Sequence, residues 1–169
     1  MTSSKAAEQQ DAVVAEIEIE ASPERVFRAL TDSAELLAWW SREPSVVDTV
    51  FEMDARPGGL WRYEGRPAPG SNHGDVGKQL AENSPTNIFE AHGEVLECIP
   101  PQLLVWTWIA NWHKNPRLVT TVRWELTPKG KKTLVRVTHR GLKDEPISRQ
   151  DYIGGWAGVL KLLLQHLSA

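Results

Sequence analysis

The chain has 169 residues, a net charge of −3 at pH 7 and a single cysteine. The small negative charge argues against a nucleic-acid-binding protein, and one cysteine excludes a disulfide within the chain. No apolar run reaches the roughly 20 residues of a membrane span, and the N-terminus lacks the apolar core of a signal peptide. We therefore expect a cytoplasmic protein without nucleic-acid or membrane partners, with a disordered tail over 1–12 and one domain over 13–169.

The first element is predicted to be a strand over 13–21. Apolar residues alternate there with Glu16, Glu18 and Glu20. A period of two with charge on one side is typical of a strand that has one solvated face.

Two short helices are predicted after this strand. Ser22 followed by Pro23 is typical of a helix start, and Val26, Phe27 and Leu30 follow at helical spacing. Asp32 with Glu35 three residues later resembles a capping box and indicates the start of a second helix through Trp40.

The middle of the chain is predicted to hold strands over 46–55 and 60–64. After these strands the alternation of apolar and polar residues ends. Residues 65–87 are rich in glycine, proline, asparagine and serine and contain hardly an apolar run. We expect a long loop there, which is either a flexible insertion or a lid over a pocket.

Four further strands are predicted over 88–98, 103–110, 119–127 and 133–139. They follow one another through short turns, so consecutive antiparallel pairing needs no crossover helix, and a meander is the simplest topology.

The last element is predicted to be a helix over 148–167, with Ser148 as its N-cap. Gly154 and Gly155 would allow close backbone approach near Trp156. One helix is too narrow to cover six or seven strands, so the sheet must curl around it. The prediction is therefore an α+β fold with a hydrophobic pocket between sheet and helix.

The candidate pocket walls come from the aromatic residues, which include eight tryptophans. We take as candidate wall residues those that share the presumed inward face of a strand or the apolar stripe of the last helix. They are Trp106, Trp108, Trp124, His139, Trp156 and Leu160.

Catalytic chemistry has little support in the sequence. The five histidines are scattered without metal-ligand spacing, and no nucleophile motif or phosphate-binding loop is present, so no metal and no cofactor are expected. His139, at the end of an inward strand face, and then His92 are the candidate acid–base groups, each against the alternative of a structural hydrogen bond.

Several segments resemble a known family. They are SPERVFRALTDSAELLAWW at 22–40, PGGLWRYE at 57–64, HGEVLECIPPQLLVWTW at 92–108, VRWELTPKGKKTLVRVTHRGL at 122–142 and GWAGVLKLLLQHL at 155–167. Together they resemble the START-related SRPBCC superfamily, and within it the bacterial proteins named for similarity to the activator of the heat-shock-90 chaperone ATPase. The resemblance implies the helix-grip fold, but it implies no catalytic residues, because this superfamily hosts many functions.

Three functions remain open at this stage. The first is binding of a small hydrophobic or aromatic molecule in the pocket. The second is a cyclase- or hydrolase-type enzyme that uses the same pocket, and the third is a chaperone-interaction module of the stress response. Apolar residues on both faces over 88–110 also suggest a homodimer through the outer face of the sheet.

Overall fold

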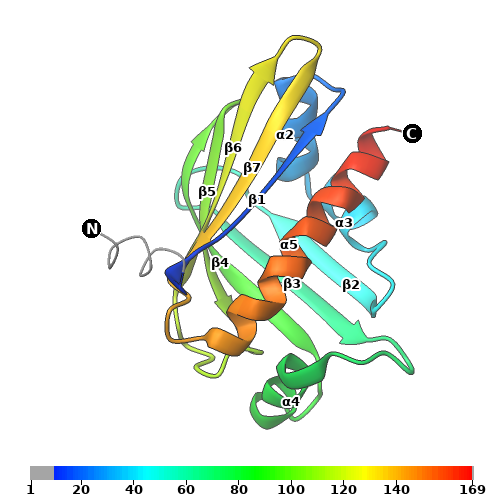
Figure 1. The fold of residues 1–169 in the computed structure, drawn as a ribbon, viewed down its shortest axis with the longest axis vertical. Coiled ribbons are helices and arrows are strands. Elements are labelled where there is room, and N and C mark those ends of the chain that lie inside the picture. Colours follow the sequence, from blue (N-terminus) through cyan, green and yellow to red (C-terminus); the bar gives the residue numbers. More distant parts are fainter. Residues whose placement is uncertain (1–9, 169) are drawn as a thin grey trace.

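The computed structural model describes residues 10–168, in which seven strands form one antiparallel sheet that curls around a long helix (Figure 1). The strands are β1 (Val13–Ile19), β2 (Val46–Met53), β3 (Leu60–Pro67), β4 (Phe89–Ile99), β5 (Leu103–Ala110), β6 (Thr120–Lys129) and β7 (Lys132–Arg140). The helices are α2 (Pro23–Thr31), α3 (Ser33–Trp40), α4 (Gly74–Asn83) and α5 (Pro146–Leu167).

The sheet order is β1-β7-β6-β5-β4-β3-β2, so β2 to β7 form a meander. β1 pairs with β7 in the register Val13 to His139 and Ile19 to Thr133. Helix α5 crosses the concave face of this sheet, while α2 and α3 lie beside its C-terminal half (Figure 1). The predicted α+β helix-grip fold is confirmed.

Both predicted caps of the short helices are present. The Ser22 hydroxyl accepts a hydrogen bond from the Arg25 amide at 3.2 Å, and the Asp32 carboxylate accepts one from the Glu35 amide at 2.9 Å. Each bond satisfies one of the amides that a helix start leaves without an intrahelical partner.

The start of α5 differs from the prediction. The helix begins at Pro146, and Ser148 is buried inside it rather than capping it. Glu145, just before the helix, is buried and uses its carboxylate to accept the backbone amides of Lys114 and Asn115 at 2.6 and 2.8 Å. The predicted start was wrong by two residues: Pro146 occupies the first turn, and Glu145, held by these long-range bonds, is the residue before the helix.

The long loop expected over 65–87 is also corrected, because β3 continues to Pro67 and helix α4 lies within the segment. α4 buries only Val76 and Leu80 as aliphatic side chains. Hydrogen bonds also attach this helix to the loop after β5: the Asn83 side-chain amide donates to the carbonyls of Asn111 and His113 at 2.9 and 2.8 Å. A helix held mainly by polar bonds shows little hydrophobic period, which is why the sequence did not indicate it.

The tail expected over 1–12 falls mostly outside the described residues. Of the part that is described, Asp11 is ordered, since its backbone carbonyl accepts a hydrogen bond from the Leu142 amide at 2.9 Å. Its carboxylate accepts a second one from the Gly141 amide at 3.2 Å.

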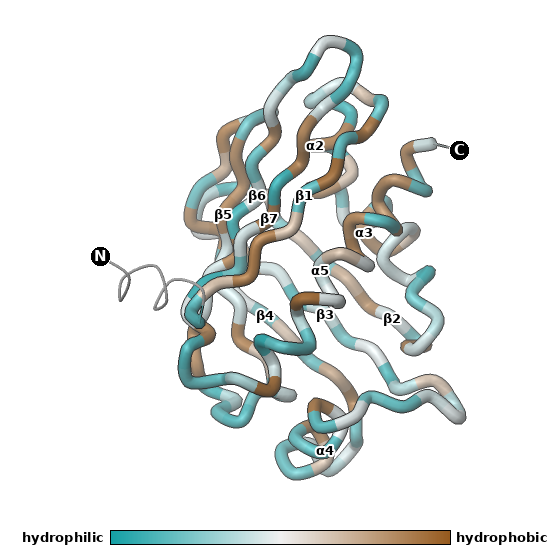
Figure 2. The backbone as a smooth tube through the Cα atoms, viewed as in Figure 1, coloured by the Kyte–Doolittle hydropathy of each residue, from teal (hydrophilic) through white to brown (hydrophobic). Residues whose placement is uncertain are grey.

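The turn between β6 and β7 is exposed to solvent. The turn between β6 and β7 is hydrophilic in Figure 2, and Lys129 and Lys132 there lie near Glu18 and Glu20 of the first-strand region. Such exposed pairs contribute little to stability.

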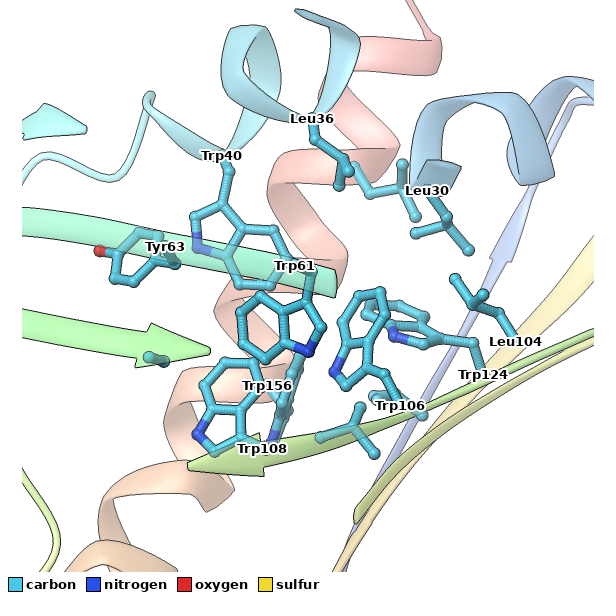
Figure 3. Packing of buried hydrophobic residues seen from close by; sticks show 14 of the residues in the cluster. Leu30, Leu36, Trp40, Trp61, Tyr63, Leu104, Trp106, Trp108, Trp124 and Trp156 are labelled. Atoms are coloured by element: carbon cyan, nitrogen blue, oxygen red, sulfur yellow. The ribbon is translucent and has the colours of Figure 1, made fainter. Parts of the chain in front are cut away.

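All eight tryptophans belong to one network of ring contacts in the core. The path runs from Trp39 through Trp40 to Trp156 on α5, and from there to Trp108 at 5.5 Å between ring centroids. From Trp108 it branches to Trp112 and, through Trp61 and Trp106, to Trp124. Figure 3 shows six of these indoles converging between sheet and helix.

Trp156→Ala should destabilise the protein by about 3–5 kcal/mol, because a nearly fully buried indole would be replaced by a void. Urea unfolding followed by circular dichroism would measure this. Leu37→Ala, on the exposed side of α3, is the control and should cost less than about 1 kcal/mol. A Trp156→Ala cost as small as that of the control would show that Trp156 contributes little to the core.

Candidate functional site

A cavity of about 360 Å³ lies between α5 and the concave face of the sheet. Its walls are mainly aromatic and come from α3, α4, α5 and the four strands β2 to β5, together with the turn before β2 and the loop after β5. The principal wall residues are Trp40, Tyr63, Phe89, Trp108, Trp112 and Trp156. Figure 3 shows four of them, Trp40, Tyr63, Trp108 and Trp156, around one region.

One side of the cavity is polar. Glu43 and Ser45, in the turn before β2, line it together with His73 at the start of α4 and Asp151 of α5. A second and more open hollow of about 910 Å³ shares Ser45, His73 and Asp151 with the first. The cavity therefore has an aromatic interior that continues into a polar outer hollow between α4 and the start of α5.

Gly154 and Gly155 line the cavity where α5 passes over it. A Cβ atom placed on either glycine would meet no atom within 4 Å. The expected close backbone approach is therefore absent. These glycines instead leave open space on a helix face where side chains would otherwise fill it.

The residues predicted for the pocket fall into two groups. Trp108 and Trp156 line the cavity. The other four are almost completely buried and are not among the residues that line it: Trp106, Trp124, His139 and Leu160.

His139 lies in the middle of a chain of hydrogen bonds that runs from Trp156 to the backbone of Trp108. The Trp156 indole donates to its Nδ1 at 3.1 Å, so the proton of the neutral ring is on Nε2, which lies 2.7 Å from the Thr120 hydroxyl. That hydroxyl in turn donates to the Trp108 carbonyl at 2.9 Å. Both ring nitrogens are used, which leaves His139 no free lone pair for a base.

His92 lies on the other side of the sheet. It is exposed on β4, where the neighbouring Ala91 and Gly93 are buried. Since successive strand residues point to opposite faces, its side chain lies on the outer face, away from the cavity.

The sequence did not single out a second buried polar cluster around Tyr152. The Tyr152 hydroxyl accepts a hydrogen bond from the Trp108 indole at 3.0 Å and lies 2.8 Å from Nε2 of His113. Tyr152 lies on the buried face of α5, which predicts core packing and no polar role, whereas His113 lies in a loop with no periodic pattern. The cluster fixes the orientation of Trp108, one of the cavity walls.

Burial determines the charge state of these groups. Burial lowers the pKa of His113 to about 4, and burial together with nearby His113 lowers the pKa of His139 well below its usual value. Burial also raises the pKa of the Tyr152 hydroxyl. At neutral pH both histidines and the tyrosine are uncharged.

A metal site has no support among residues 10–168, where no three histidine, cysteine, aspartate or glutamate side chains are grouped suitably for an ion. Cys98 is a free thiol whose pKa is raised by burial, the opposite of what a reactive thiolate requires. No helix in this part of the chain is long and apolar enough to cross a membrane.

The stability of the protein should fall as the pH drops from 6.5 toward 4.5. The unfolded chain takes up protons on His113 and His139 in this range, whereas the folded chain does not until its lower pKa values are reached. Each histidine should cost about 1.4 kcal/mol per pH unit, measured by urea unfolding at a series of pH values.

In the variant His113→Gln, the free energy of unfolding should fall about half as steeply with decreasing pH, because one of the two titrating groups is gone. A free energy of unfolding that stays level between pH 6.5 and 4.5 would contradict the neutral, buried state of these histidines.

Comparison with known structures supports the fold. MLL2253 from Mesorhizobium loti is 22% identical, with a TM-score of 0.66 over 93% of this chain and 96% of that one. CV1439 from Chromobacterium violaceum is 21% identical, with a TM-score of 0.66 over 92% and 96%. DynU16, from the dynemicin biosynthetic locus, is 17% identical, with a TM-score of 0.66 over 94% of this chain and 48% of that one.

None of the curated proteins matches the sequence significantly. A family model does match, over residues 20–168, and its description is activator of Hsp90 ATPase homolog 1-like protein. Because the match extends over most of the chain and the fold agrees with it, this protein belongs to the activator of Hsp90 ATPase homolog 1-like family.

Proposed function

We propose that this protein binds a small hydrophobic or aromatic molecule in the cavity between α5 and the sheet. The observation that carries the proposal is the aromatic cavity of about 360 Å³. This volume lies in the range of small-molecule sites, about 300–1,000 Å³, and such sites are lined mostly by apolar and aromatic side chains with a few polar groups.

The walls are held in place before any ligand arrives. Trp108 contacts the rings of Trp61, Trp112 and Trp156, and its indole N–H donates to Tyr152. Side chains that are already fixed lose little conformational entropy on binding. The apolar surface of a ligand would then gain the full benefit of leaving water.

The positions of the candidate bases favour binding over catalysis. Both nitrogens of His139 are engaged in hydrogen bonds, and His92 lies on the outer face of the sheet. A general base must reach the reacting proton with a free lone pair. The two histidines that the sequence offered as bases therefore do not favour the enzyme hypothesis.

Gly155→Leu should weaken binding of the neutral fluorescent probe N-phenyl-1-naphthylamine by at least about tenfold, because a leucine would fill the open space beside the helix. Ala157→Leu adds the same side chain two residues away, at an exposed position that does not line the cavity, and should bind as the unchanged protein does. Fluorescence titration measures both.

Equal affinity of the two variants would place the probe elsewhere, and no binding by the unchanged protein would argue against a hydrophobic site. Native mass spectrometry of protein purified gently from its own host complements the titration. An additional mass that is lost on denaturation would give the chemical class of the natural ligand.

The family description favours a chaperone interaction as the second candidate function. This interaction would use the surface of the protein and would not need the cavity. It predicts that the protein is retained by the immobilised heat-shock-90 chaperone, and that Gly155→Leu is retained equally well. Absence of retention at micromolar concentration would remove this candidate.

A further inference from the structure

We infer, building on the proposed binding function, that the cavity selects protonated amines, in which an apolar or aromatic body carries an ammonium group. The body would occupy the aromatic interior, and the ammonium group would lie at the polar side formed by Glu43 and Asp151. Three features favour an ammonium group there: the charges that line the cavity, the bonds that hold them in place, and the aromatic faces beside them.

The charged groups that line the cavity are predominantly acidic. Glu43 and Asp151 are carboxylates, and none of the lysines or arginines among residues 10–168 lines the cavity. His73 is the one lining group that can carry a positive charge, and its Nε2 lies 3.1 Å from the Ser45 carbonyl and 3.0 Å from the Ser71 hydroxyl. A ligand carboxylate or phosphate would meet repulsion with little compensation.

Glu43 is held firmly in position. Its Oε1 accepts hydrogen bonds from the Ser45 amide at 2.9 Å and from the Ser45 hydroxyl at 2.6 Å. Burial, and then the charge of Glu43, raise the pKa of the Tyr63 hydroxyl, so the field of this carboxylate reaches the cavity wall. A fixed carboxylate needs no reorganisation to receive a cation.

Asp151 stands one helical turn before Gly155, on the face of α5 that borders the open space. Partial burial raises the pKa of this carboxyl, and the nearby His73 only partly offsets that effect. The Asp151 side chain is nevertheless exposed to solvent at the border of the cavity, so a ligand can reach it. An ammonium group placed beside this carboxylate would form a charge-assisted pair with it.

The aromatic walls add to the preference. A cation within about 6 Å of an indole centroid is attracted by the ring quadrupole, and tryptophan is the most favourable ring for this contact. Trp40, Trp108 and Trp156 line the same cavity as the two carboxylates. A neutral ligand gains from the apolar walls alone, whereas an ammonium gains from the walls and the charges.

Three ligands with one body and different charges test the inference: 1-naphthylmethylamine, 1-naphthalenemethanol and 1-naphthoic acid. Their affinities would be measured at pH 7 by displacement of N-phenyl-1-naphthylamine. We expect the amine to bind about tenfold more tightly than the alcohol, and the acid to bind most weakly.

The variant Asp151→Asn should bring the amine to within about threefold of the alcohol and leave the alcohol unchanged. Asp144→Asn removes the same charge from an exposed position that lines neither hollow, and should leave all three affinities as they were. Circular dichroism melting of both variants confirms that they are folded.

The outcomes separate the two proposals. If the alcohol binds as tightly as the amine, or the acid binds best, the preference for amines is overturned while hydrophobic binding stands. An amine preference that persists unchanged in Asp151→Asn also overturns the role given to this carboxylate. If none of the three displaces the probe, and the probe itself does not bind, both proposals fail.

Discussion

The packing of Trp156 against the concave sheet is the interaction on which the rest of the structure depends. Its indole contacts Trp40 of α3, Trp108 of β5 and Trp124 of β6, and its N–H donates to His139 of β7. One side chain therefore connects α5 to three strands and a second helix. The hydrogen bond adds to the effect of the buried area, because a buried indole N–H without a partner would cost free energy.

The cavity follows from this arrangement. Next to Trp156, Gly154 and Gly155 bring no side chains to fill the space beside α5. On the other side, α4 is attached by polar bonds to the loop after β5 and supplies Val76 and His73 to the walls. The same features that complete the core thus leave an opening that is aromatic inside and acidic at one side.

The polar side chains of the site have different roles at different depths below the surface. His139 and His113 are buried, uncharged and committed to orienting Trp156 and Trp108. Glu43 and Asp151 border the cavity and remain available to a ligand. This division explains why the most conspicuous histidine in the sequence has a structural position, while two carboxylates without any motif form the candidate recognition site.

The sequence by itself determined the strands, the two short helices and the body of the long helix, because periodicity and caps are local consequences of which side chains are buried, and its family resemblance implied the helix-grip fold. It also indicated Trp108 and Trp156 as wall residues, since both belong to strong apolar faces. Only the tertiary structure decided that Trp106, Trp124 and His139 fill the core, that α4 is a helix, and that Asp151 borders a cavity. An inward face predicts burial, but whether a buried residue meets another side chain or an empty space depends on distances between elements that are remote in the chain.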